Sequence, residues 1–163
     1  MDADDLRRHI SYKRDGERSL NPVVAAHMLA ALDDGATPDY QVLHQAACWP
    51  APPAVVYHTA AVADREAILA TGLHGSQPGS GDSPWADPDG VWASQPVGVY
   101  VAEGPDSVGR WSRWEAWDVW AVDVSDLTWA PDLMNPRCWL ITADIAPQRL
   151  TLADTRPHAR VQL

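Results

Sequence analysis

VVYHTAAVADREAILATGL, residues 55–73, is the stretch of sequence that decides the fold. Residues 55–57 form a short apolar run typical of a strand, and residues 63–71 are typical of a helix that ends before Gly72. The stretch therefore predicts a strand followed closely by a helix. His58 falls where the apolar run ends, and a histidine there either bonds neighbouring backbone or projects into a cleft.

The chain before this stretch is predicted to be helical. NPVVAAHMLAALDDG is the clearest helix, with Asn21 as N-cap, Pro22 at the first helical position and Gly35 at the C-terminal cap. TPDYQVLHQAAC predicts a second, shorter helix. The prolines of WPAPPA then end it, because proline cannot continue a helix.

The chain after it alternates between loops, strands and short helices. Residues 74–97 are rich in Gly, Pro, Ser and Asp and predict a long loop. The segments GVYVAE, DVWAVDV and CWLITADI predict strands, RLTL and RVQL two more, and PDSVGRWSRWEAW a short helix. Helices first, then strands with helices, favour an α+β fold over a doubly wound sheet. We expect an N-terminal helical lobe, residues 1–50, and a β core, residues 51–163, in one compact domain overall.

Composition limits the classes of function. The 163 residues suit one domain with a real core, and the net charge of −10 argues against a broad phosphate-binding surface. Nine Trp and no Phe make tryptophan the main bulky aromatic residue. The two cysteines form no CxxC motif and indicate buried thiols in a reducing cytoplasm. The N-terminus lacks the apolar region of a signal peptide, no apolar run is long enough to span a membrane, and no metal-ligand spacing is found.

Each candidate for a functional site also has an ordinary structural explanation. Tyr100 follows Gly98 in a predicted strand, where a tyrosine usually packs in a core or interface. Asp144 ends an apolar segment, where an aspartate is often a turn residue. Arg110 and Arg113 share one helix face, and they either bind an anion or pair with nearby carboxylates.

Four motifs in one order resemble those of the ADP-ribosyltransferase superfamily, whose members use NAD. YHT, residues 57–59, is similar to the first motif of poly-ADP-ribose-polymerase-type and diphtheria-type members, where His-Gly is usual. GVYVAEGPDSVGRW, residues 98–111, is similar to their glycine-led strand with a tyrosine and a serine-containing helix. WAVDV follows, and NPRCWLITADIAPQRL, residues 135–150, resembles the close of the NAD-dependent RNA 2′-phosphotransferases.

The resemblance covers about residues 55–152 and implies a split mixed β-sheet core of the ADP-ribosyltransferase type. It also implies NAD as co-substrate. ISYKRDGERSLN, in the N-terminal part, loosely resembles the helical lobe that precedes the sheet in bacterial toxin members. Thr59 replaces the glycine of the first motif. Two further departures matter: no glutamate stands in CWLITADI, where transferases often carry one, and the phosphotransferase branch usually has a second histidine where this chain has Tyr100.

The resemblance also implies roles for particular residues. One ring nitrogen of His58 would hold a ribose hydroxyl of NAD while backbone orients the other, and the ring of Tyr100 would stack on nicotinamide. An arginine such as Arg110 would grip the pyrophosphate. Asp144, or Thr142 two residues before it, would take the third catalytic position. The implied catalytic residues are His58, Tyr100, Asp144 and Thr142, and the implied NAD-binding residues are His58, Thr59, Gly98, Tyr100, Ser107 and Arg110.

The expected function is therefore transfer of ADP-ribose from NAD to an acceptor, in the cytoplasm. The acidic composition favours a protein or small-molecule acceptor. One alternative is an RNA 2′-phosphotransferase-like enzyme, which needs a basic groove from Arg110, Arg113, Arg137 and Arg149. Another is a catalytically inactive member that binds a nucleotide or a partner protein, which the missing glutamate and Thr59 suggest.

Overall fold

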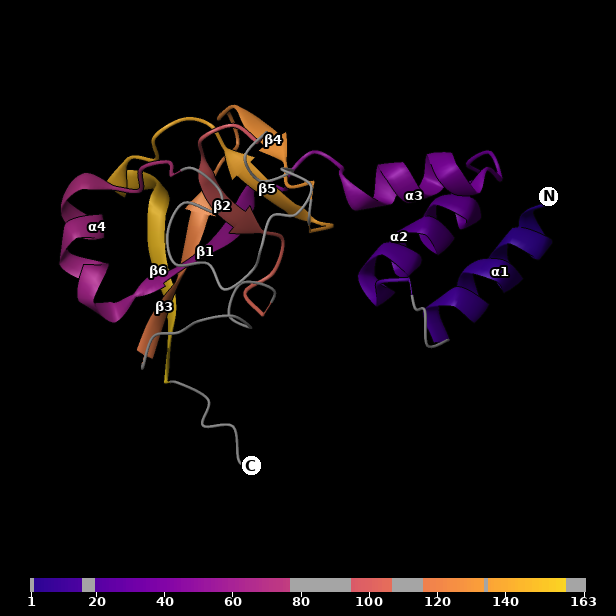
Figure 1. The fold of residues 1–163 in the computed structure, drawn as a ribbon, viewed down its shortest axis with the longest axis horizontal. Coiled ribbons are helices and arrows are strands. Elements are labelled where there is room, and N and C mark those ends of the chain that lie inside the picture. Colours follow the sequence, from indigo (N-terminus) through magenta and orange to yellow (C-terminus); the bar gives the residue numbers. More distant parts are fainter. Residues whose placement is uncertain (1, 16–19, 77–94, 107–115, 134, 158–163) are drawn as a thin grey trace. The chain divides into compact units, whose positions relative to one another are not determined.

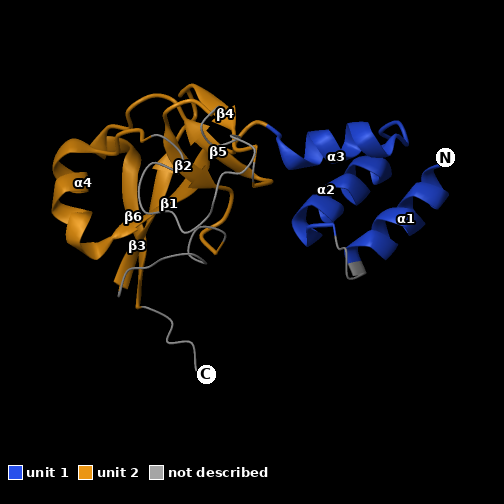
Figure 2. Ribbon diagram, in the orientation of Figure 1, with its two compact units in different colours: residues 1–50 blue, residues 51–163 orange. Residues whose placement is uncertain are grey.

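The structure is a computed structural model that describes residues 2–15, 20–76, 95–106, 116–133 and 135–157. The chain divides into two compact units, residues 1–50 and 51–163 (Figure 2). Each unit has its own hydrophobic core. No helix in these described ranges is long and apolar enough to cross a membrane.

The first unit consists of three helices (Figure 1). They are α1 (Ala3–Asp15), α2 (Pro22–Asp33) and α3 (Tyr40–Cys48). The predicted start of α2 is confirmed, because the Asn21 side chain accepts a hydrogen bond from the Val23 amide at 2.9 Å. Gly35 follows α2 with a φ of +87°, which confirms it as the glycine that ends the helix. Apolar side chains spaced along all three helices form the core: Leu6, Ile10, Val24, Met28, Leu32 and Leu43.

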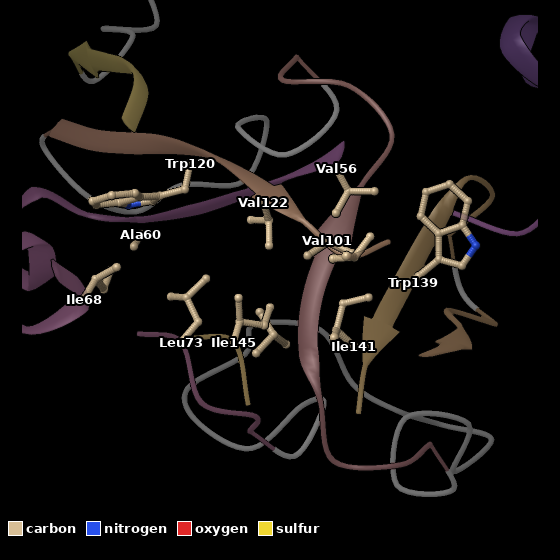
Figure 3. Packing of buried hydrophobic residues seen from close by; sticks show 12 residues of the cluster. Val56, Ala60, Ile68, Leu73, Val101, Trp120, Val122, Trp139, Ile141 and Ile145 are labelled. Atoms are coloured by element: carbon tan, nitrogen blue, oxygen red, sulfur yellow. The ribbon is translucent and has the colours of Figure 1, made fainter. Parts of the chain in front are cut away.

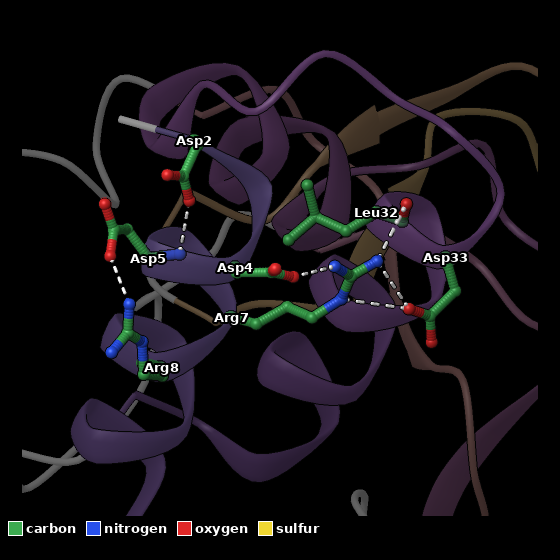
Figure 4. Close-up of polar contacts among 7 residues, drawn as sticks. All are labelled: Asp2, Asp4, Asp5, Arg7, Arg8, Leu32 and Asp33. Atoms are coloured by element: carbon green, nitrogen blue, oxygen red, sulfur yellow. Dashed lines mark hydrogen bonds and ion pairs between the residues drawn. The ribbon is translucent and has the colours of Figure 1, made fainter.

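Arg7 connects α1 with the end of α2 (Figure 4). It donates to the Asp33 carboxylate at 3.1 Å and, within α1, to Asp4 at 2.9 Å. It also donates to the carbonyl oxygen of Leu32 at 3.4 Å, one of the last-turn carbonyls that have no partner within a helix. Because the two contacts with carboxylates are exposed, we expect the buried apolar side chains to contribute most of the stability of this unit.

The second unit is built on one six-stranded sheet among the described residues, with strand order β4-β5-β2-β1-β3-β6. The strands are β1 (Val55–Ala61), β2 (Val99–Ala102), β3 (Ala116–Asp123), β4 (Trp129–Pro131), β5 (Cys138–Ile141) and β6 (Leu150–Pro157). Two 3-10 turns, η1 (Val62–Asp64) and η2 (Pro147–Arg149), and the helix α4 (Arg65–Thr71) complete it. The α+β class is confirmed. The expected mixed sheet is wrong, because every described pair of neighbouring strands is antiparallel.

One face of the sheet carries the larger core (Figure 3). Side chains alternate between faces along a strand, so every second residue of β1, β2, β3 and β5 points to this core. α4 contributes Ile68, and the segments after α4 and β5 contribute Leu73 and Ile145. The two tryptophans of this cluster, Trp120 and Trp139, lie at opposite ends of it.

Three expected elements differ from the structure. β1 does not end at Tyr57 but continues to Ala61, so His58 lies within the strand. CWLITADI was expected to be one strand, yet β5 ends at Ile141, and β4 was not expected at all. RLTL belongs to one longer strand, β6. RVQL, most of the expected long loop and most of the expected helix after β2 lie outside the described residues.

Candidate functional site

β1 and β2 are joined by a single register pair among the described residues, Tyr57 with Ala102. Next to this pair, His58 Nδ1 lies 2.8 Å from the carbonyl oxygen of Tyr100. A carbonyl oxygen can only accept a hydrogen bond, so Nδ1 carries the proton and donates it. The imidazole thus bonds the backbone of β2 beside the one backbone pair that joins the two strands.

The His58 ring is neutral near neutral pH. Burial lowers the pKa of His58 below its ordinary value, because an imidazolium loses hydration there, and the hydrogen bond to the Tyr100 carbonyl opposes this only in part. In a neutral ring with its proton on Nδ1, Nε2 bears a lone pair and can only accept. Within the described part of the chain, no hydrogen bond to His58 Nε2 is seen. Nε2 of His58 is therefore an acceptor whose direction is set by the Nδ1 bond to Tyr100.

The ring of Tyr100 lies on the opposite face of the sheet. Val99 and Val101 point into the larger core, whereas Tyr100 packs with Ala102 and Cys138. His58, between Val56 and Ala60 of the same core, shares their face. The structure thus joins His58 to the main chain of Tyr100 and places the phenol ring elsewhere.

On that face the phenol of Tyr100 lies beside the thiol of Cys138, and both groups are protonated. Burial raises the pKa of Tyr100, and contact with Cys138 raises it further. Burial likewise raises the pKa of the Cys138 thiol to about 11. A thiol that remains protonated is a poor nucleophile, so Cys138 is suited to packing. Both cysteines are free and buried, as the sequence predicts.

Gly98 is a glycine for reasons of packing within the sheet. A Cβ there would lie 2.9 Å from the carbonyl oxygen of Ile141 and 3.0 Å from the Cβ of Leu140. The neighbouring chain segment thus approaches Gly98 too closely for a side chain. Thr59 is half-buried on β1, facing away from His58. Ser107, Arg110, Arg113, Trp85 and Trp92 lie outside the described residues.

CWLITADI was expected to be one strand, which would put Thr142 and Asp144 on one face, but both residues lie beyond the end of β5. The Thr142 hydroxyl lies 2.8 Å from that of Thr128. Asp144 is 73% exposed, and its carboxylate lies 3.3 Å from Nδ1 of His74. The structure therefore brings Asp144 together with His74, a residue that sequence reasoning missed.

Asp118 is a buried carboxylate on β3. It is 0% exposed and receives two hydrogen bonds from Arg65, at 2.8 and 2.6 Å. The Thr155 hydroxyl donates a third at 2.8 Å. The sequence indicates this burial, because alternation along DVWAVDV puts Asp118 on the same strand face as the buried Trp120 and Val122.

Two other carboxylates and two arginines are also paired. Glu103 binds the guanidinium of Arg137 through both oxygens, and Arg149 pairs with Asp126 at 2.6 Å. In the ranges that the structure describes, no group of three or more His, Cys, Asp or Glu side chains is arranged to hold a metal ion. Comparison of the sequence with protein-family models and with curated proteins gave no match.

Proposed function

We propose that the protein is an NAD-dependent ADP-ribosyltransferase that cleaves the bond between nicotinamide and ribose. The observation that carries the proposal is the neutral His58 ring, with Nδ1 bonded to the Tyr100 carbonyl and Nε2 left as an acceptor. A ribose hydroxyl can donate to this nitrogen. An uncharged, oriented acceptor is suited to hold NAD without adding positive charge beside the ribose, whose C1′ becomes cationic as nicotinamide leaves.

Other residues support this role to different degrees. Thr59 directly follows His58 on β1. If His58 holds the ribose, the backbone of Thr59 is placed to hold the carboxamide of the nicotinamide attached to that ribose. For Tyr100 the main-chain carbonyl, which orients His58, has more support than stacking by the ring, because the ring lies on the opposite face. Arg110 and Ser107 remain proposals from the sequence, for the pyrophosphate and its surroundings.

The RNA 2′-phosphotransferase alternative has weaker support. It needs a basic groove, and two of the four arginines expected to line it, Arg137 and Arg149, are already paired with carboxylates. A paired arginine offers an incoming phosphate less charge than a free one. The net charge of −10 also disfavours binding of RNA, which is itself negatively charged.

His58→Asn is expected to lower the affinity for NAD roughly tenfold, the loss of about one hydrogen bond of 1.4 kcal/mol. The asparagine amide nitrogen occupies the place of Nδ1 and can still donate to the Tyr100 carbonyl, but nothing occupies the place of Nε2. The unliganded protein should therefore melt near the parent temperature, while the NAD-induced rise in Tm shrinks. Thermal unfolding with and without NAD measures both quantities.

Two further variants complete this experiment. His58→Gln places a carbonyl or amide group nearer the position of Nε2 and should retain more NAD affinity than His58→Asn. His27→Ala is the matched control, because His27 is an exposed histidine on α2. An unchanged NAD effect in His58→Asn would contradict the role of His58. NAD binding by the parent without release of nicotinamide would identify the inactive, nucleotide-binding alternative.

A further inference from the structure

His74 and Asp144 are held opposite each other by a short antiparallel bridge. The Leu73 amide donates to the Ile145 carbonyl at 2.9 Å, and the Ile145 amide donates to the Leu73 carbonyl at 2.9 Å. In such a two-bond pair the next residues outward, here His74 and Asp144, face each other directly with side chains close together. Backbone geometry therefore fixes the meeting of the two side chains.

The contact gives the His74 ring a defined orientation. Asp144 Oδ2 lies 3.3 Å from His74 Nδ1, within ion-pair distance, and a negative carboxylate beside this nitrogen favours the form of the ring that carries its proton on Nδ1. Nε2 is then the nitrogen with the lone pair, and no contact to it is seen in the described part of the chain. His74 is 59% exposed, so Nε2 is accessible to a molecule from solvent. A carboxylate that orients an imidazole in this way also stabilises the imidazolium that forms when Nε2 takes a proton.

The pair is connected to the strand that orients His58. Two residues after His74, Ser76 pairs with Gly98 through backbone bonds of 3.1 and 3.3 Å. Two residues along β2 from Gly98 is Tyr100, whose carbonyl holds the His58 ring. Each two-residue step covers roughly 6–7 Å of extended chain. His74 is therefore attached near the end of β2 that leads to His58.

We infer that His74 is the general base that takes the proton of the acceptor, and that Asp144 is the residue that positions it; this rests on the proposed function. The bond between C1′ and the nicotinamide nitrogen breaks, and its electron pair neutralises the pyridinium. An oxygen of the acceptor hydroxyl, or of water, forms the new bond to C1′ while its proton moves to His74 Nε2. The imidazolium later releases this proton to solvent. Asp144 thus acts through His74 and not on the ribose itself.

The test compares nucleophiles that need a base with one that does not. Methanol and water must lose a proton as they attack C1′, whereas azide is already an anion. Nicotinamide release from NAD is measured with each nucleophile for the parent, His74→Ala and Asp144→Asn, with His27→Ala as control. The exposed pair contributes little to folding, so both site variants should unfold near the parent temperature.

His74→Ala is expected to lower kcat with water and methanol about 100-fold, within the range of general-base catalysis, and Asp144→Asn about tenfold. KM for NAD should stay near that of the parent. Azide should restore nicotinamide release in His74→Ala to near the parent rate with azide, and imidazole in solution should restore part of the methanol reaction.

Equal losses with methanol and azide would show that His74 is only structural and would overturn the inference while leaving the proposed function in place. Parent-like rates of His74→Ala with every nucleophile would overturn it as well. If the parent releases no nicotinamide with any nucleophile, the proposed function fails, and this role of His74 fails with it.

Discussion

Gly72→Ala is expected to lower the free energy of unfolding of the sheet unit by roughly 3–5 kcal/mol, the largest effect of any change considered for this chain. Gly72 ends α4 with φ +83° and ψ −161°, a conformation open in practice only to glycine. An added Cβ would lie 2.0 Å from the Ile145 carbonyl oxygen. That oxygen accepts the Leu73 bond, so the bridge that sets His74 against Asp144 must shift too.

Denaturant unfolding followed by tryptophan fluorescence measures this change, because Trp49 is the only tryptophan outside residues 51–163. Gly35→Ala is the matched control: Gly35 has a φ of +87°, but a Cβ there meets nothing within 4 Å. It should cost only about 1 kcal/mol, from the left-handed backbone alone, measured by circular dichroism of the helical unit. Equal losses in the two variants would contradict a steric cause at Gly72.

Asp118→Ala is expected to cost about 3 kcal/mol, because it leaves Arg65 and the Thr155 hydroxyl without their shared buried acceptor. Arg65 is 31% exposed and regains some hydration, which places the effect at the low end for a broken buried pair. Asp126→Ala, which breaks the pair of Arg149 with a 71% exposed carboxylate, is the control and should leave stability nearly unchanged.

Asp118 also makes the free energy of unfolding depend on pH. The hydrogen bonds from Arg65, with that from Thr155, hold the pKa of Asp118 below its usual 3.8. The unfolded chain therefore takes up this proton first as pH falls. The stabilisation is present above the unfolded pKa and is lost as pH falls from about 3.8 through the lower folded value. Asp118→Asn should flatten that part of the stability profile, and an unchanged profile would contradict the assignment.

The parts of the fold that depend on neighbouring residues were predicted well. Asn21, Pro22 and Gly35 act within a few residues of the helix that they bound, so α2 begins and ends where the sequence indicates. β1 was predicted too short, because a histidine and a threonine interrupt its apolar run. It continues to Ala61 because pairing with β3, a distant segment, supplies its hydrogen bonds. β5 ends at Ile141 because its register with β2 and its register with β4, both formed with distant segments, end there.

The candidate site was predicted only in part, for the same reason. The resemblance drew attention to His58 and Tyr100, but the contact of an imidazole with a carbonyl 42 residues away depends on how β1 and β2 meet. His74 carried no signal in its own segment, because its partner Asp144 lies far along the chain. Which face of β2 bears the Tyr100 ring follows from alternation, yet which face meets His58 depends on the register between strands.

The single register pair between β1 and β2 also affects how the sheet can deform. Three strands, β4, β5 and β2, form one ribbon, and β1, β3 and β6 form the other. Each ribbon is internally paired over several positions, whereas among the described residues one backbone register pair and the His58 bond join β1 to β2. Strands in a sheet are twisted against their neighbours, and a long ladder resists any change of that twist. We therefore expect a change of twist between the two ribbons to leave the ladders within each of them intact, and His58 lies where the two ribbons meet.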